Sequence, residues 1–215
     1  KLLTRPDRLQ QFKQDMSEVS RMIKRRDGTY IEEVVEDYRI IDTAEKLKAL
    51  VAECKSGGYE LFSVDCEWHG NNYATGKLRS MQLCWAPGKA AYIRFMDDKL
   101  NYALDIDYKE AGAILGTWLN RPEVKYMAHH ASADLPWMNK WLDLLWYGKC
   151  IFDSEFVLQC VEEASDLSLT RVSMAYTELG RYDLPLLQWK KKNGKLCVDG
   201  YGLIPDAILI PYALK

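Results

Sequence analysis

Two acidic residues inside an apolar segment limit the folds open to this chain more than any other feature. The segment LFSVDCEW, residues 61–68, has the composition of a buried strand, and its acids are Asp65 and Glu67. Alternate side chains of a strand share a face, so both carboxylates point the same way. Burying unpaired carboxylates is costly, and a hard divalent cation offsets that cost because it prefers oxygen ligands. The segment therefore predicts a central strand with a Mg²⁺ or Mn²⁺ site, or else an edge strand with a solvated acidic face.

The patterns on either side of this segment predict a mixed α/β domain. Two neighbouring apolar runs are joined by Pro87-Gly88, which is typical of a β-hairpin. Thr43 is a good N-cap for the helix that follows it. We expect an α/β fold with a mixed β-sheet of about five strands flanked by helices. The predicted elements are strands at 38–41, 61–68, 78–85, 90–95, 124–128 and 150–152, helices at 44–55, 109–119, 134–145, 154–163, 169–179 and from about 205, and a polar loop at 188–202.

Charge and composition exclude several classes of protein. The 215 residues include 29 Lys and Arg against 31 Asp and Glu, a net charge of −2, so a clamp that holds duplex DNA by positive charge is not expected. Residues 1–30 carry eight basic and four acidic residues in a helical pattern, and we predict a basic helical extension over 1–35 before a domain at 36–215. No membrane span or signal peptide is recognisable, and six scattered cysteines without a CxxC pair indicate an intracellular protein with reduced thiols.

Two later segments carry further candidate site residues. In MAHHASADLPWM, Asp134 starts a predicted helix after a short strand, where an acid can also be a simple N-cap. In IPDAILIPYALK, Tyr212 lies on the final predicted helix, where a lone tyrosine is more often a packing residue. Neither segment is specific when taken alone.

In this order along the chain, the three segments resemble the three motifs of the DEDD nuclease superfamily in its tyrosine-type branch. The chain is most similar to the 3′–5′ proofreading exonuclease domain of family A DNA polymerases, the bacterial DNA polymerase I type, over roughly residues 36–215. The resemblance implies a ribonuclease H-like fold. It extends beyond the motifs to the hairpin after Pro87-Gly88, to the helix start at Phe152-Asp153-Ser154 and to the segment 166–169.

The resemblance also implies a mechanism. Asp65, Glu67 and Asp134 would hold two Mg²⁺ ions, for which Mn²⁺ can substitute, around the terminal phosphodiester, and Tyr212 would orient the attacking water. The last metal ligand of this family would follow Lys215 directly, and we expect a longer parent polymerase chain to supply it. The implied activity is proofreading by removal of nucleotides from single-stranded or frayed DNA 3′ ends.

Substrate contacts are expected close to these motifs. Trp68, His69 and Asn71 follow the first motif and could stack on or bind a single strand, with Asn72 and the lysines at 190–192 as further candidates. His130 stands where the family often has asparagine, four residues before the second-motif acid. The expected partners are a DNA 3′ end and a polymerase domain in the same parent chain. We expect a monomer in the cytoplasm or in an organellar or viral-host compartment, without a membrane partner.

Two other functions fit the same residues. A stand-alone ribonuclease D-like or Werner-type 3′–5′ exonuclease would have nearly the same DCEW and MQLCW segments. A non-catalytic RNase H-like module that binds nucleic acid or a partner would not need all four motif residues together. Two other acids are not expected to be ligands: Asp206 lies six positions before Tyr212, on a different side of a 3.6-residue helix, and Asp153 is placed to cap a helix.

Overall fold

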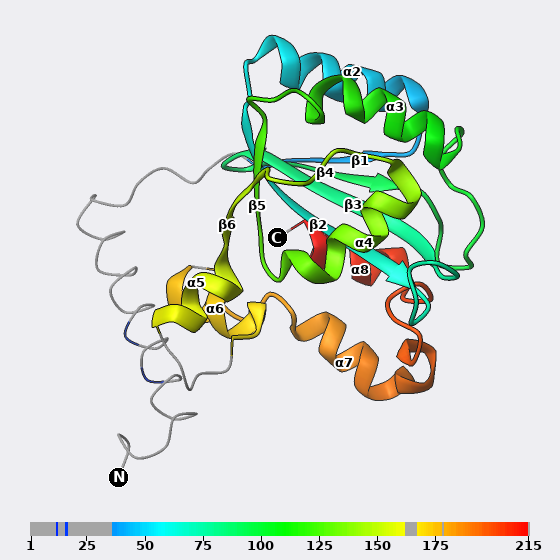
Figure 1. Cartoon of the computed structure of the whole chain (residues 1–215). Coiled ribbons are helices and arrows are strands. Elements are labelled where there is room, and N and C mark those ends of the chain that lie inside the picture. Colours follow the sequence, from blue (N-terminus) through cyan, green and yellow to red (C-terminus); the bar gives the residue numbers. More distant parts are fainter. Residues whose placement is uncertain (1–11, 13–15, 17–35, 162–166, 178, 215) are drawn as a thin grey trace.

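A six-stranded mixed sheet with helices on both faces forms the body of the protein (Figure 1). The computed structural model describes residues 12, 16, 36–161, 167–177 and 179–214. The strands are β1 (Asp37–Ile41), β2 (Leu61–His69), β3 (Lys77–Ala86), β4 (Lys89–Arg94), β5 (Lys125–Ala128) and β6 (Cys150–Asp153). The helices are α2 (Ala44–Ser56), α3 (Tyr108–Leu119), α4 (Ala131–Leu142), α5 (Ser154–Val161), α6 (Leu169–Tyr176), α7 (Leu184–Asn193), the 3₁₀ turn η1 (Gly194–Cys197) and α8 (Asp206–Ala213). The predicted α/β class is confirmed, with six strands where about five were expected.

The sheet order β1-β4-β3-β2-β5-β6 places β2 in its interior. Strands β2, β3 and β4 are antiparallel neighbours, as the predicted hairpin requires, while β1, β5 and β6 each pair in parallel with a neighbour. β2 pairs with β5 only over residues 61–63 and then continues to His69. The two strands therefore separate just before Asp65, which leaves that side of β2 open to other elements.

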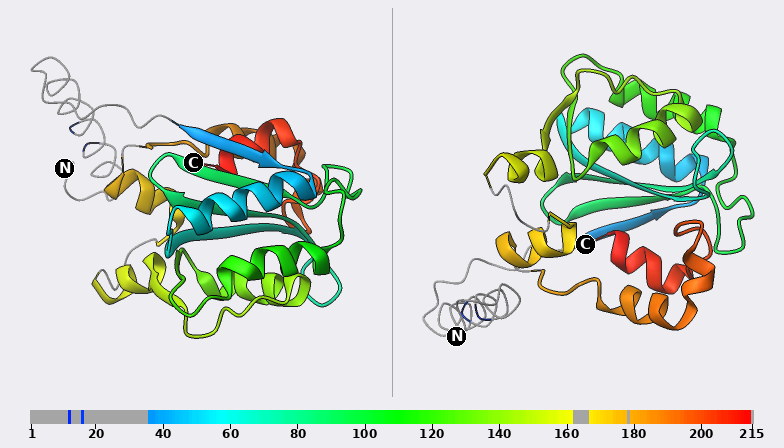
Figure 2. Two further views of the ribbon diagram at one scale, coloured as in Figure 1. Left: turned by 90° about the horizontal axis from the view of Figure 1, so that it is seen from above. Right: turned by 60° about the horizontal axis from the view of Figure 1, so that its bottom comes forward.

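Helices cover the two faces of the sheet unequally. Figure 2 shows α2, α3 and α4 on one face and α7 with α8 on the other. The main core lies under the first group, where the Phe62 and Trp118 rings are 5.3 Å apart and Trp137 and Trp146 are also buried. Each such side chain contributes about 2 kcal/mol to folding by leaving water. The tryptophans between 118 and 146 are thus packing residues, of which Trp141 is only partly buried.

The helix with the second-motif acid begins earlier than predicted. It starts at Ala131 and not at Asp134, and His130 precedes it in the left-handed backbone region with φ 63°. The Asp153 carboxylate accepts hydrogen bonds from the backbone amides of His130 at 3.0 Å and Ala131 at 2.8 Å. A residue on another strand caps this helix, so no local signal marks its start.

The prediction of a polar loop at 188–202 is wrong for its first part. Residues 184–193 form α7, which follows Asp183 and has Pro185 in its first turn. Leu186 is buried against Ile204 and Leu209 in a second small core. The lysines of α7 lie at or near the surface, together with the exposed Leu184 and Leu187.

Other sequence predictions have mixed outcomes. Thr43 caps α2 as expected, and Ser168 caps α6, which ends at Tyr176 and not at 179. All six cysteines carry free thiols. Within the part of the chain that the structure describes, no helix is long and apolar enough to span a membrane. Apart from residues 12 and 16, the predicted extension over 1–35 lies outside the described residues.

Candidate active site

Asp65 and Glu67 lie side by side on β2 and face the same side of the sheet. Their register partners on β3 are Gln82 and Ser80, and Glu67 is only 5 % exposed. Cys66, which lies between them, contacts Asp134 of α4, so the two acids face the opposite side of the sheet, where α8 lies (Figure 2). The strand is thus an interior strand whose acidic face is largely covered, and the alternative of a solvated edge strand is wrong.

Asp134 reaches the same region from the other face of the sheet. It lies in the first turn of α4, where its carboxylate oxygen Oδ1 is 3.2 Å from the Cys66 thiol sulfur. Parallel stacking of the Trp68 and Trp137 rings, with centroids 5.1 Å apart, packs α4 against the end of β2. The helix occupies the side of β2 from which β5 has separated, and this brings the third acid next to the first two.

The three carboxyl groups share an unfavourable electrostatic environment. Burial raises the pKa of Asp65 to about 6 and that of Asp134 to about 8, and the charge of Asp65 adds to the effect on Asp134. Burial, followed by the charges of the two aspartates, also raises the pKa of Glu67 well above its usual range. Like charges with little water around them oppose ionisation. The three carboxyl groups therefore bind either protons or a metal cation favourably.

This donor set fits a hard divalent cation. The buried Glu67 and Asp134 and the partly buried Asp65 supply the oxygen ligands that Mg²⁺ and Mn²⁺ prefer, and a cation would relieve their repulsion. As the described side chains lie, no group of three or more His, Cys, Asp or Glu is arranged to hold a metal ion. One oxygen of the Asp134 carboxylate is in contact with the Cys66 thiol. The three acids therefore lie near one another without all pointing at a common point.

Tyr212 is the central ring of a stack of three tyrosines. Its ring centroid lies 5.6 Å from that of Tyr182 and 6.3 Å from that of Tyr201, and the ring planes are within 16° and 14° of parallel. The Lys190 ammonium lies 4.6 Å from the outer ring of Tyr201. Burial, and next the charge of Glu67, raise the pKa of Tyr212, so its hydroxyl stays protonated. The flanking tyrosines were not predicted, because nothing in their local sequence distinguishes them.

The start of α8 is tied to the sheet by two arginines. Asp206 accepts a hydrogen bond of 2.6 Å from Arg79, which is fully buried, and it also pairs with Arg94. The Arg79 guanidinium donates to the backbone carbonyls of Tyr201 and Gly202 at 2.6 and 3.0 Å. Asp206 therefore has two arginine partners, and its exclusion as a metal ligand stays a prediction.

Two of the predicted substrate-binding residues lie around α4. Trp68 stacks on Trp137, and His130 is half-exposed and pairs with Glu155 at the start of α5. Asp153, expected to cap a helix, accepts from the Glu155 amide as well as from the start of α4. A substrate contact by Trp68 or His130 stays a prediction.

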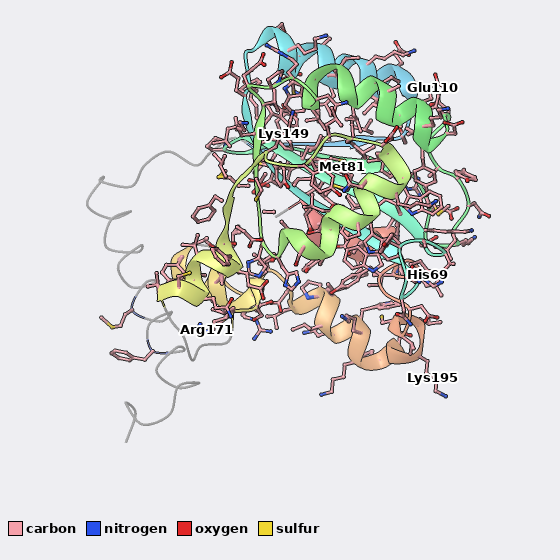
Figure 3. The ribbon with its side chains drawn as sticks, viewed as in Figure 1. His69, Met81, Glu110, Lys149, Arg171 and Lys195 are labelled. Carbon is pink, nitrogen blue, oxygen red and sulfur yellow. The ribbon has the colours of Figure 1, made fainter. Side chains whose placement is uncertain are left out.

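The other two predicted substrate-binding residues lie at the far end of β2. His69 forms an isolated antiparallel bridge with Gly200, and the Asn71 amide donates to Asp199 at 3.2 Å. Figure 3 shows His69 at the end of β2, near the turn after α7 from which Lys195 extends outward. The His69 Nδ1 atom is buried without a hydrogen-bond partner among the described residues. These contacts join the loop after β2 to the loop before α8.

Comparison with solved structures identifies the class of fold. The EXO domain of Aedes aegypti Nibbler superposes with a TM-score of 0.54 at 15 % identity, covering 86 % of this chain and 90 % of that one. Trypanosoma brucei RNase D, solved with GMP, gives 0.60 at 16 % identity, covering 82 % and 52 % of the two chains. Escherichia coli RNase D gives 0.52 at 16 % identity, covering 83 % and 45 %. The chain spans about half the length of the two RNase D chains, and the shared fold is that of RNase H-like DEDD exonucleases.

The family model identifies the chain more closely. A model described as 3′–5′ exonuclease, of the DNA polymerase A type, matches residues 38–198, and the chain belongs to this family. The resemblance inferred from the motifs is thereby confirmed. DEDD exonucleases generally use divalent metal ions. No curated protein matches the chain significantly.

Proposed function

We propose that this protein removes nucleotides one at a time from single-stranded 3′ ends, with Asp65, Glu67 and Asp134 as ligands for divalent cations and Tyr212 beside them. The observation that carries the proposal is the meeting of two buried carboxylates, Glu67 and Asp134, with the partly buried Asp65, next to a partly buried tyrosine from α8. A non-catalytic module has no need to bring together three acids that repel each other, two of them buried. Two Mg²⁺ ions are the proposed cofactors, with Mn²⁺ as a substitute.

The chain's own residues have distinct roles in this proposal. The two aspartates and the glutamate bind the cations, which when bound acidify water and stabilise the leaving 3′ oxygen. Tyr212 keeps its proton, so it orients the attacking water through a hydrogen bond and does not act as a base. The two neighbouring tyrosine rings hold it in one orientation. Burial of the site keeps bulk water away from the terminal phosphodiester.

The proposed substrate is the frayed 3′ end of DNA during proofreading, within a parent family A polymerase. The matching family supports this choice. Trp68, His69, Asn71 and His130 are the proposed contacts to the strand. The near-neutral net charge of −2 fits a domain to which a polymerase domain in the same chain delivers the end.

A stand-alone RNase D-like exonuclease is the second candidate. Its support is the fold shared with Trypanosoma brucei RNase D and with Escherichia coli RNase D, whose structure is described as that of an exoribonuclease involved in structured RNA processing. The two candidates use the same acids and differ in the sugar of the substrate. A direct comparison of DNA and RNA strands separates them.

The test is digestion of 5′-labelled single-stranded DNA and RNA of one sequence in Mg²⁺, in Mn²⁺ and in EDTA. We expect a ladder that shortens from the 3′ end, that needs a divalent cation, and that Asp65→Asn abolishes. Glu45→Gln, an exposed acid on α2, is the matched control and should digest normally. Equal digestion by wild type and Asp65→Asn would overturn the assigned site. Faster digestion of RNA than of DNA would favour the RNase D-like candidate.

A further inference from the structure

Cys66 connects the strand that carries two of the acids to the helix that carries the third. It lies between Asp65 and Glu67 in sequence, so its side chain points to the opposite face of β2, toward α4. Its sulfur is 3.2 Å from the Oδ1 atom of Asp134 and 3.8 Å from the backbone carbonyl oxygen of the same residue. The thiol is buried, with 2 % of the residue exposed.

We propose that Cys66 is a positioning residue whose thiol holds the Asp134 carboxylate against β2 and thereby raises the affinity of the acidic site for divalent cations. The inference rests on the proposed function, because it assigns a role at the same site. It adds a residue that binds neither cation nor substrate and acts through Asp134.

The geometry indicates that the thiol contact supports cation binding by Asp134 and does not compete with it. A carboxylate has about four acceptor positions on its two oxygens, and the thiol occupies one of them. The other oxygen of Asp134 is left for a cation, while the contact limits how the side chain can turn. The pairing of β5 with β2 ends at Ser63, so β5 does not hold this part of β2. The thiol is thus a direct polar link between the two elements that supply the ligands.

The size of the effect follows from other sites at which a partner orients a metal-binding side chain. Removing such a partner commonly weakens metal affinity by about 10- to 100-fold. A buried cysteine can also be a simple packing residue that behaves as a small apolar group. The two roles differ in what they require, because packing needs volume whereas positioning needs a hydrogen-bond donor.

Three substitutions separate donor from volume. Cys66→Ser keeps a donor at similar size, Cys66→Val fills the space without a donor, and Cys66→Ala removes both. Cys54→Ala is the matched control, because Cys54 is an equally buried free thiol on α2, away from the acids. We expect the alanine and valine variants to bind Mn²⁺ about 10-fold or more weakly than wild type, and the serine variant to bind it nearly normally.

The measurement is a Mn²⁺ titration of each whole chain, followed by electron paramagnetic resonance of the free ion, with thermal unfolding in EDTA as a check of folding. Unchanged or tighter Mn²⁺ binding by Cys66→Val and Cys66→Ala would overturn the positioning role. Equal weakening by Cys54→Ala or by Cys66→Ser would also overturn it, since packing alone would then explain the loss. The proposed function fails in a different way, by Mn²⁺ binding that is absent from wild type or unchanged in Asp65→Asn.

Discussion

The Nη2 atom of Arg79 lies 2.6 Å from the Oδ1 atom of Asp206 and joins the interior of the sheet to the helix that carries Tyr212. The register between β2 and β3 passes from Glu67–Ser80 to Trp68–Leu78, so Arg79 is the extra residue of a β-bulge. Bulges commonly redirect one side chain, and here the redirected guanidinium reaches the loop before α8.

The first prediction concerns this buried ion pair. Asp206→Ala should lower the free energy of unfolding by about 3 kcal/mol, because it leaves the Arg79 charge buried with no carboxylate partner at 2.6 Å. Nuclease activity should fall as well, since α8 then loses its attachment to the sheet. Urea unfolding measures the first effect and strand digestion the second. Asp42→Ala, which breaks an exposed pair with Lys46, should cost at most about 0.5 kcal/mol, and an equal cost at both sites would contradict the prediction.

The second prediction tests the tyrosine stack. Tyr182→Phe keeps a ring against Tyr212 and should preserve the rate of the chemical step, whereas Tyr182→Leu removes the ring. An aromatic pair contributes about 0.5–1.5 kcal/mol, so the leucine variant should be about 2- to 10-fold slower. Single-turnover digestion of a labelled strand gives the rate without product release. A phenylalanine variant as slow as the leucine variant would show that the Tyr182 hydroxyl matters more than its ring.

The third prediction concerns Lys190, one of the three lysines considered as substrate contacts. Its ammonium lies over the ring of Tyr201, which stacks on Tyr212, and its charge offsets a small part of the rise that burial causes in the pKa of Glu67. Lys190→Met should weaken single-strand binding and reduce the slope of log affinity against log salt by about 0.7, the value for one phosphate contact. The measurement is fluorescence anisotropy at several salt concentrations. Lys191→Met, at the exposed neighbouring position, should change neither quantity, and identical slopes for both variants would reject the contact.

The fourth prediction is a pH dependence of stability in the metal-free protein. Burial raises the pKa values of Asp65, Glu67 and Asp134 above those of the unfolded chain. The folded protein therefore binds more protons than the unfolded chain between about pH 4 and about pH 8, and the free energy of unfolding falls as pH rises through this window. The slope is about 1.4 kcal/mol per pH unit for each proton by which the two states differ.

Chemical unfolding in EDTA at pH 5 and pH 8 measures this dependence. Wild type should be more stable at pH 5, and Mn²⁺ should restore stability at pH 8 because it binds only the folded site. The partly buried His129, whose pKa is lowered by desolvation, has the opposite pH dependence, but it is present in every variant. Asp134→Asn should therefore show a smaller loss between pH 5 and pH 8. The same loss in wild type and variant would mean that the acids do not titrate as inferred.

Local patterns predicted some elements well and others poorly. The strand with Asp65 and Glu67 was predictable because its apolar residues and its two acids lie within eight positions. The start of α4 was not, because its capping group is Asp153, more than twenty residues later in the chain. The helix α7 was missed for a related reason: its second half, QWKKKN, is mostly polar, and Leu186 is buried because α8 packs against it.

By itself, the sequence determined the class of fold and the family, and it singled out Asp65, Glu67, Asp134 and Tyr212, because periodicity and motif chemistry are local properties. The tertiary structure alone decided how these residues meet: the separation of β5 from β2 admits α4, the bulge at Arg79 directs an arginine to α8, and two further tyrosines enclose the third motif's ring. These contacts join segments distant along the chain. Their energy comes from burial and charge pairing that exist only after folding, so a local sequence pattern could not predict these contacts.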